Sequence, residues 1–327
     1  MAKSEGLPQR AYGRWLGYFF ISLALAYAFA VLVLFLSDPY GRSGIRTSAT
    51  VPNLAERYWM VTRAMDQQFN SAIVGNSTSI PMQPEILDRL TGARFASLSI
   101  AGSGAPVALK MARFFLSRHA NAKILIVALD DSWCRSATGM AEGRPFPFWL
   151  YDSDPAYIFG LFANASFGSL REGLLLDARN SHRIDGYHPY DEAFFGHGYD
   201  NIEAVIKRLS VVKRPVQPQV PFPYAFEPPR LLEDLVAEIP QSVTFVLFWT
   251  PRYVNLIPIS GSPAETADKA CKEQTASIAR KHRNVRVVDW SGAREENLDP
   301  SNFFEANHYR DTLALKIQQD IAAALKN

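Results

Sequence analysis

A serine in a glycine-containing turn and an acid–histidine pair lie near opposite ends of the sequence. The serine is Ser77, in the segment GNSTS (75–79) directly after a short apolar run, and the pair is Glu305 and His308, in FFEANHY (303–309). A serine hydroxyl becomes a strong nucleophile when an imidazole takes its proton, and the imidazole needs an acid on its other nitrogen to fix its tautomer. These residue types predict acyl transfer through Ser77, with His308 as general base and Glu305 as its acid. Ser79 in the same turn is the alternative nucleophile.

Five short apolar runs alternate with helical patterns and would position these residues. The runs cover residues 71–74, 94–100, 122–129, 242–249 and 284–290. The third, AKILIVAL, is continuously apolar and rich in β-branched residues, which is typical of a parallel strand covered on both faces. The helical patterns cover residues 52–68, 84–90, 105–119, 264–282 and 309–326. This alternation predicts an α/β fold with a doubly wound, mostly parallel five-stranded sheet, whose ligands bind beyond the carboxyl ends of the strands.

An uncharged stretch near the N-terminus predicts a membrane anchor. Residues 15–36 (WLGYFFISLALAYAFAVLVLFL) carry no charge, and a helix of this length at about 1.5 Å per residue crosses a hydrocarbon core of about 30 Å. Lys3, Arg10 and Arg14 outweigh Glu5 before it, which predicts a cytoplasmic tail and an extracytoplasmic remainder. The alternative is a cleaved signal peptide, whose apolar core usually has about 7–15 residues. We expect a tail (1–14), a helix in the lipid bilayer (15–36), a stem with a first helix (37–69) and an α/β domain (70–327).

The middle of the chain interrupts the alternation of strands and helices. Residues 131–200 are rich in aromatic residues, glycines and prolines, with a helical pattern around residues 169–180. We expect an insertion that overhangs the sheet edge, with residues 183–197 forming part of the substrate wall. Residues 213–229 hold six prolines and predict an irregular connector.

Charge and composition argue against several other classes of protein. The formal charge is +2, with 34 basic and 32 acidic residues and no Lys/Arg block, so we expect no nucleic-acid partner. Cys134 and Cys271 show no zinc-ligand spacing; in an oxidising compartment they could form one disulfide or remain as two buried thiols. Three histidines share a loop with two aspartates at spacings that fit no standard metal site: His182, His188, His197, Asp185 and Asp191. We therefore expect no metal and no cofactor.

The order of these motifs resembles that of the SGNH/GDSL hydrolase superfamily. The segment GNST (75–78) falls on the first block of that family, with Asn76 where aspartate is commonest. The segment AGSG (101–104) falls on the second block, and EANH (305–308) falls on the last, with Glu305 in place of the usual aspartate. The single span, the stem DPYG (38–41) and FFEANHY are similar to a membrane-anchored bacterial branch, akin to extracytoplasmic proteins that place acyl groups on cell-surface polymers. The resemblance covers roughly residues 38–320.

The resemblance implies an oxyanion hole built from the backbone N–H groups of Ser77 and Gly102. One donor in such a hole is worth about 2.7–4 kcal/mol. The third block of the family usually adds an asparagine, but here that place is LDDSWC (129–134), and a carboxylate donates no hydrogen bond unless it is protonated. The hydroxyl of Ser132 could be the third donor, or the hole has two donors only. Glu305 can reach the His308 ring if the segment turns helically, because residues three apart share a helix face.

The resemblance implies a protein of the bacterial inner membrane with its catalytic domain on the periplasmic side. Its expected activity is that of an acyl esterase or O-acyltransferase, acting on cell-surface or exported polysaccharide through an acyl-Ser77 intermediate. A polytopic membrane O-acyltransferase that delivers acyl groups is the implied partner. The alternative is a non-catalytic SGNH fold that binds glycan or scaffolds an export complex, which the changes at positions 305 and 129–134 favour.

Overall fold

The computed structural model describes residues 9–38, 40–43, 56–135, 145–164, 201–211, 213–215 and 222–326. The chain divides into two compact units. The first contains Met1–Leu54 and Asp152–Arg183, and the second contains Ala55–Tyr151 and Ile184–Asn327. The helical pattern at 169–180, the predicted substrate wall at 183–197 and the loop with the three histidines lie outside the described residues.

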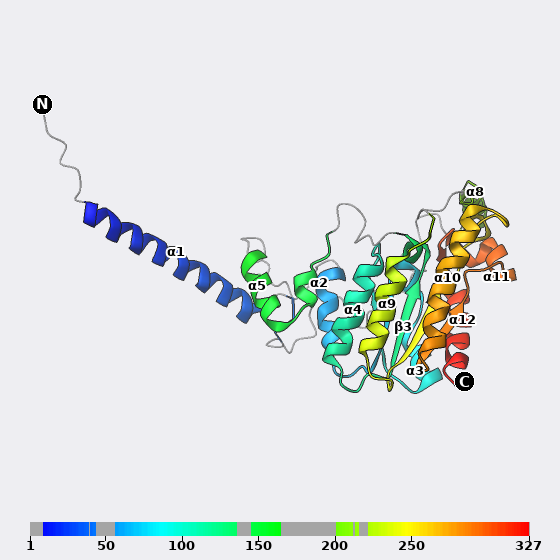
Figure 1. The fold of residues 1–327 in the computed structure, drawn as a ribbon, viewed down its shortest axis with the longest axis horizontal. Helices are drawn as coiled ribbons and strands as arrows, with labels where there is room; N and C mark the ends of the chain where they lie inside the picture. The colour runs from blue at the N-terminus through cyan, green and yellow to red at the C-terminus, as the bar shows by residue number, and fades with distance from the viewer. Residues whose placement is uncertain are drawn as a thin grey trace, which may run out of the picture. The chain divides into compact units, whose positions relative to one another are not determined.

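The first unit contains helices α1 (Gln9–Ser37) and α5 (Asp154–Asn164). Within α1, Tyr12–Leu36 is long and apolar enough to cross a membrane. Most of its large apolar side chains are exposed, and Figure 1 shows α1 as one uninterrupted helix. The helix ends before Asp38, whose φ of +42° lies in the left-handed region common just after a helix C-terminus.

The second unit is built on a five-stranded sheet that the alternating pattern predicts correctly. Its strands are β1 (Ser71–Gly75), β2 (Phe95–Ser99), β3 (Ile124–Leu129), β4 (Thr244–Trp249) and β5 (Val285–Asp289). All neighbouring strands run parallel, in the order β2-β1-β3-β4-β5. This is the order of flavodoxin-like doubly wound folds, in which the chain reverses its winding direction between β1 and β3.

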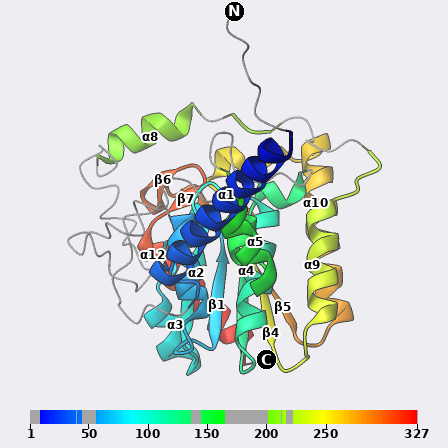
Figure 2. The ribbon, with the colours of Figure 1, turned by 90° about the vertical axis from the view of Figure 1, so that its left-hand side faces the viewer.

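Helices cover both faces of this sheet, as Figure 2 shows. One layer contains α2 (Glu56–Met65), α4 (Ala105–Arg118), α9 (Glu227–Glu238) and α10 (Pro263–Lys281). The opposite layer contains α3 (Pro84–Thr91) and α12 (Asp311–Ala324), with α8 (Ile202–Ser210) near its edge. The helix α2, which the sequence groups with the stem, contacts α4 and β2 and so belongs to the second unit.

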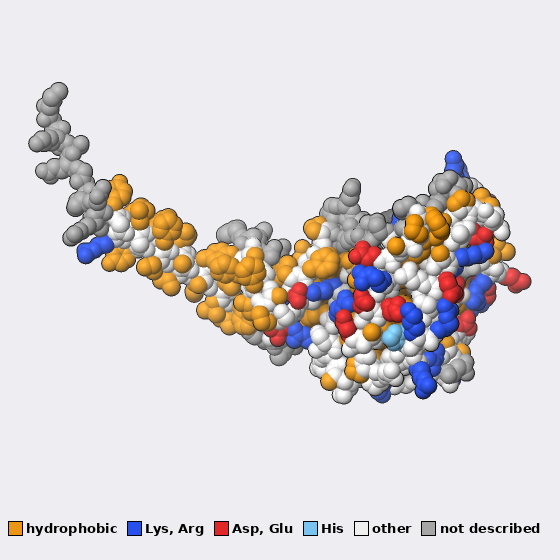
Figure 3. Space-filling view, in the orientation of Figure 1, with side chains coloured by type: hydrophobic (Ala, Val, Ile, Leu, Met, Phe, Trp, Pro, Cys, Tyr) orange, Lys and Arg blue, Asp and Glu red, His pale blue; other side chains and the backbone are white. Residues whose placement is uncertain are grey.

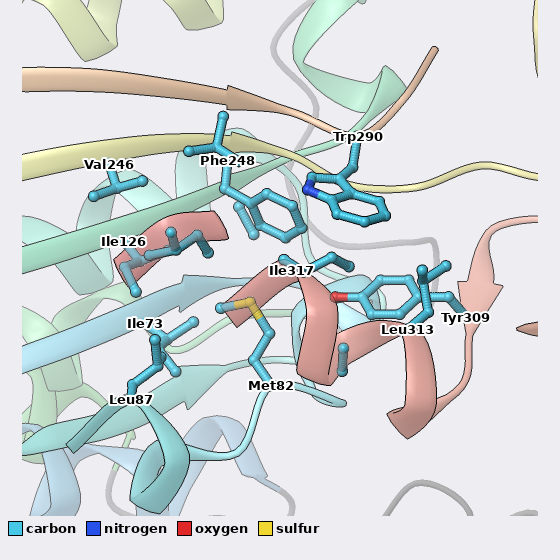
Figure 4. Packing of buried hydrophobic residues seen from close by; sticks show 14 of the residues in the cluster. Ile73, Met82, Leu87, Ile126, Val246, Phe248, Trp290, Tyr309, Leu313 and Ile317 are labelled. Carbon is cyan, nitrogen blue, oxygen red and sulfur yellow. The ribbon is translucent and has the colours of Figure 1, made fainter. Parts of the chain in front are cut away.

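The core beneath α3 and α12 follows from strand register. Ile73 pairs with Ile126, which pairs with Val246, so these side chains point to the same face of the sheet. Figure 4 shows them packed toward Leu313 and Ile317 of α12. Burial on both faces explains why the central strand β3 (ILIVAL) is continuously apolar instead of alternating.

The proline-rich connector ends earlier than the sequence predicts. Pro228 and Pro229 lie in the first turn of α9, within the range assigned to irregular chain. A proline is tolerated there because the first helical N–H groups have no partner within the helix.

Gly75 controls the turn that leads from β1 to Ser77, and a larger residue has no room there. An added Cβ would lie 2.5 Å from Ser79 Oγ and 2.8 Å from Ala128 Cβ. We expect Gly75→Ala to destabilise the protein by about 1–3 kcal/mol, the usual cost of overpacking, and to displace Ser77. Gly292→Ala is the matched control, because no atom lies within 4 Å of its added Cβ. Equal urea midpoints for the two variants would contradict this.

Candidate active site

Ser77 lies just beyond the carboxyl end of β1. The strand ends at Gly75, and a short 3₁₀ helix (Ser77–Ser79) follows. Asn76 caps it: its side-chain oxygen accepts hydrogen bonds from the backbone N–H of Thr78 at 3.0 Å and from the Thr78 hydroxyl at 2.8 Å. The site therefore sits beside the β1–β3 pair, at the crevice where open α/β sheets bind ligands.

A short β-hairpin presents Glu305 and His308 to this edge. Its strands are β6 (Phe303–Glu305) and β7 (His308–Tyr309), and Glu305 is the cross-strand partner of His308. Phe303 pairs with Tyr309, and both of these side chains are fully buried, which anchors the hairpin. The helical turn expected here is therefore wrong: Glu305 reaches the histidine across two paired strands, and α12 begins only at Asp311.

The hairpin brings the three predicted residues into one chain of hydrogen bonds. Ser77 Oγ lies 2.9 Å from His308 Nε2, and His308 Nδ1 lies 3.0 Å from Glu305 Oε2. The contact between Ser77 and His308 joins residues 231 positions apart in the sequence. The side chain of His308 is 15% exposed and that of Glu305 is 36% exposed, so the ring is held largely out of water while the acid stays partly hydrated.

The two contacts of the ring define its tautomer. An ionised carboxylate can only accept, so the proton of a neutral His308 lies on Nδ1 and is donated to Glu305. Nε2 is then left as an acceptor for the hydroxyl of Ser77. This is the arrangement that a serine nucleophile and its general base need. The catalytic roles of the three residues remain predictions.

The predicted oxyanion residues line the same cavity, but their hydrogen-bond donors are not equally free to bind an oxyanion. Ser77, Gly102 and Ser132 all border it. Gly102 has a φ of +70°, a conformation that a residue with a Cβ rarely adopts. The Ser132 hydroxyl donates to Asp130 Oδ1, as does its backbone N–H at 3.0 Å, so this hydroxyl is engaged in the structure.

Asp130, which directly follows β3, pairs with Asn76. Asn76 Nδ2 donates to Asp130 Oδ2 at 2.6 Å. Burial raises the pKa of the Asp130 carboxyl, and the nearby Asp131 carboxylate acts in the same direction. The hydrogen bonds from Asn76 and Ser132 oppose this rise.

Ser79, the alternative nucleophile, lies in a different environment. Its side chain is fully buried. Its hydroxyl donates to the backbone oxygen of Asn76 at 2.8 Å and shares a hydrogen bond with the Ser99 hydroxyl at 2.7 Å. These contacts give Ser79 a structural role in the turn.

The cavity in front of Ser77 has a volume of about 770 Å³. Its wall includes charged residues that the sequence patterns do not single out, among them Arg135 and Arg208. Arg135 forms an ion pair with Asp131. Arg208, from α8, donates to the backbone oxygen of Phe304 at 3.3 Å and so connects α8 to the hairpin. No sequence signal marks Arg208, because α8 reaches the site only through the tertiary fold.

A disulfide holds one wall of the site. Cys134 and Cys271 are bonded, with their Cα atoms 5.6 Å apart, which settles the alternative between a bridge and two thiols. Cys134 ends the short helix Asp131–Cys134, directly after Asp130, and Cys271 lies in α10. The bridge therefore ties the loop that follows β3 to the helix layer.

Exchanging the Asn76–Asp130 pair tests whether it positions Ser77. Asn76→Asp would place two carboxyl groups about 2.6 Å apart in a part-buried setting, where one of them must stay protonated, and we expect a loss of about 1–3 kcal/mol in unfolding free energy. Asp130→Asn would place the new amide N–H group opposite the amide N–H group of Asn76, and we expect it to lower the unfolding free energy by about 1–3 kcal/mol. The double exchange restores a donor opposite an acceptor, so most of the stability and of any activity should return.

Urea unfolding of the four proteins forms a double-mutant cycle that checks this expectation. The coupling energy between the two substitutions should be favourable and exceed 1 kcal/mol, as it does for residues in one hydrogen-bond network. Additive losses in the double variant would show that the pair does not act as a unit.

The sequence matches no protein-family model, and no curated protein matches it. Among solved structures, the chain is similar to a gut microbial diltiazem-metabolizing enzyme, with a TM-score of 0.34 and 12% sequence identity. The similarity covers 79% of this chain and 46% of the other, so this chain spans about half the length of that enzyme.

Proposed function

We propose that this protein transfers acyl groups through an acyl-Ser77 intermediate. The observation that carries the proposal is the Ser77–His308–Glu305 chain of hydrogen bonds beside an open cavity. In the first step His308 takes the hydroxyl proton while Ser77 Oγ attacks the acyl carbonyl. The backbone N–H groups of Ser77 and Gly102 would stabilise the resulting oxyanion.

The remaining steps of the reaction use the same residues. The tetrahedral intermediate collapses, and His308 gives its proton to the departing alkoxide, leaving the acyl group on Ser77. An acceptor hydroxyl then loses its proton to His308 and attacks the acyl-enzyme. The second tetrahedral intermediate collapses, the bond between Ser77 Oγ and the acyl carbon breaks, and His308 returns the proton to Ser77. Water as acceptor makes the protein an esterase, and a sugar hydroxyl makes it an O-acyltransferase.

We propose polysaccharide as the substrate class and the SGNH superfamily as the family. The order of the motifs supports this, as does a parallel sheet with the serine after its first strand and the acid–histidine pair just ahead of its last helix. The altered third block, LDDSWC (129–134), resembles that of anchored members with acyl-transfer roles and so favours transfer over hydrolysis.

We further propose that the domain faces the periplasm of a bacterial inner membrane. The basic excess before the apolar helix supports this orientation. The Cys134–Cys271 disulfide supports an oxidising compartment, because such bonds persist outside the reducing cytosol. A polytopic membrane O-acyltransferase would then supply the acyl group from the cytoplasmic side.

The fate of the acyl group tests this proposal. The full-length protein in detergent micelles is incubated with a chromogenic acetyl ester, with and without an oligosaccharide acceptor, beside Ser77→Ala. Ester cleavage that depends on Ser77, together with acetylated sugar detected by mass spectrometry, is the result expected of a transferase. Cleavage without acetylated sugar identifies an esterase. Equal rates for the two proteins would remove Ser77 from the mechanism.

A non-catalytic glycan-binding or scaffold role is the second candidate. The observation that favours it is the Ser132 hydroxyl, which donates its hydrogen bond to Asp130 and so is not directed at an oxyanion. A binding protein of this kind would hold an oligosaccharide in the cavity with the same affinity in Ser77→Ala and cleave no ester.

A further inference from the structure

The helix α5 is apolar around its whole circumference. Asp154 is its only charged residue, and residues 155–163 (PAYIFGLFA) carry none. Tyr157 and Leu161 are buried, whereas Phe159 is 71% exposed and Phe162 is 45% exposed. A helix that is apolar on all sides belongs in a protein core or in a membrane, not on a water-facing surface.

This helix runs antiparallel to α1. At one end, Arg42 Nη1 lies 3.0 Å from Asp154 Oδ1. At the other end, the rings of Tyr27 and Phe162 meet edge to face with centroids 4.3 Å apart, and the Tyr27 hydroxyl donates to the backbone oxygen of Phe162. Figure 1 shows α5 beside the C-terminal part of α1, with which it is in contact.

The contact with Tyr27 lies deep within the apolar stretch of α1. Tyr27 precedes Leu36, the last residue of that stretch, by nine positions, or about 13.5 Å along the helix axis. The hydrocarbon core of a bilayer is about 30 Å thick, so its half-thickness is about 15 Å. Where Leu36 marks one edge of the hydrocarbon, Phe162 lies close to the depth of the bilayer centre.

Charged residues gather at the opposite end of this pair, where α1 ends and α5 begins. Asp38 Oδ1 accepts hydrogen bonds from the backbone N–H groups of Arg42 at 2.7 Å and Ser43 at 3.0 Å. The Arg42 guanidinium bonds Asp154 and the backbone oxygen of Asp152, and it lies 5.0 Å from the centre of the Tyr157 ring. Charged and aromatic residues together are typical of the level at which a membrane meets water.

We propose that α5 is embedded in lipid beside α1, so that the protein enters the outer half of the bilayer with two helices. The exposed apolar surface of α5 continues that of α1, as the hydrophobic side chains in Figure 3 show. Its outward residues, Ile158, Phe159 and Phe162, are large, whereas helix–helix contacts in membranes use small residues. Gly160, the smallest residue of α5, is buried. Lipid acyl chains are therefore the occupant that fits this surface. The proposal requires α1 to span the membrane and is independent of the chemistry at Ser77.

Spin-label accessibility in liposomes tests the proposal. The full-length protein is labelled at Phe159→Cys and reconstituted in phosphatidylcholine–phosphatidylglycerol vesicles; the disulfide leaves the introduced thiol as the only one. Separate labels at Phe29→Cys in α1 and Leu298→Cys in the second unit serve as controls, because both side chains are exposed. Collision rates with oxygen, which concentrates in hydrocarbon, are compared with those of a water-soluble nickel chelate.

The expected result is an excess of oxygen collisions at positions 29 and 159 and an excess of nickel collisions at position 298. Nickel excess at 159 with oxygen excess at 29 would overturn the proposal while leaving the span intact. Nickel excess at both 29 and 159 would overturn the span as well. An immobile label at 159, shielded from both reagents, would show that another protein covers α5 and would also overturn it. Ile158→Cys provides a second label on the exposed side should Phe159→Cys misfold.

Discussion

Replacing Ser77 with alanine is expected to lower kcat for an acetyl ester by about 10⁴–10⁶-fold. The hydroxyl is the attacking group in the proposed mechanism, and its only side-chain contact described here, with His308 Nε2 at 2.9 Å, is the one that activates it. The folded state should change little, because Ser77 is part-buried and alanine removes one oxygen. Steady-state kinetics of the two proteins, with circular dichroism to confirm folding, measure the effect.

Substitutions of the partners should show that the three residues act as one unit. His308→Ala should cost about as much as Ser77→Ala, and the double variant hardly more than either, because a serine without its base is already inactive. Glu305→Gln should cost up to about 10⁴-fold, since an amide can hold the imidazole in the wrong tautomer. Ser79→Ala is the control: it should lose stability but keep its kcat. Losses that multiply in the Ser77→Ala/His308→Ala variant would contradict a shared mechanism.

Removing the disulfide is expected to produce the largest change in stability. The bridge joins residues 137 positions apart, and in the chain-entropy account a loop of this size is worth about 4–5 kcal/mol. Activity should fall too, because Cys134 closely follows Asp130 and Ser132 at the cavity. Chemical unfolding of Cys134→Ser/Cys271→Ser beside the wild type measures the loss.

Reducing agent provides the control for this variant. Dithiothreitol should lower the unfolding midpoint of the wild type and leave that of the double-serine protein unchanged. A double-serine protein as stable as the wild type would show that the packing of α10 alone holds the loop after β3. A midpoint that falls equally in both proteins would point to a general effect of the reagent.

The sheet follows from the sequence because most of its strands, β1 to β4, are buried on both faces. Continuous apolar runs such as ILIVAL in β3 have few alternative placements in a chain of this length. The position of Ser77 follows as well, since a turn after the first strand of a parallel sheet must lie at its carboxyl edge.

The backbone geometry that joins Glu305 to His308 cannot be predicted from the local sequence. A spacing of three residues brings two side chains together on a helix and also across a two-residue hairpin. Burial of Phe303 and Tyr309 as a cross-strand pair selects the hairpin, and that burial depends on the rest of the fold. The pair formed by Asn76 and Asp130 is hidden for the same reason, because only the β1–β3 pairing brings residues 54 positions apart into contact.

The membrane-embedded position proposed for α5 cannot be predicted from its sequence alone. Its residues lie in a segment rich in aromatic residues and prolines, which predicts an irregular insertion over the substrate. Eleven residues are too few to mark a membrane helix by length. The contact between Tyr27 and Phe162 places α5 beside the apolar stretch of α1, and this contact indicates that the apolar side chains of α5 face lipid.

Covalent labelling by a fluorophosphonate tests the central claim most directly. The reagent bonds to a serine whose hydroxyl is activated by a neighbouring imidazole, whether the natural acceptor is water or a sugar. The folded full-length protein should gain one phosphonyl group, located on Ser77 by peptide mass spectrometry, and His308→Ala should gain none. A folded wild-type protein that remains unlabelled at Ser77 would contradict the proposed enzyme and favour a glycan-binding domain.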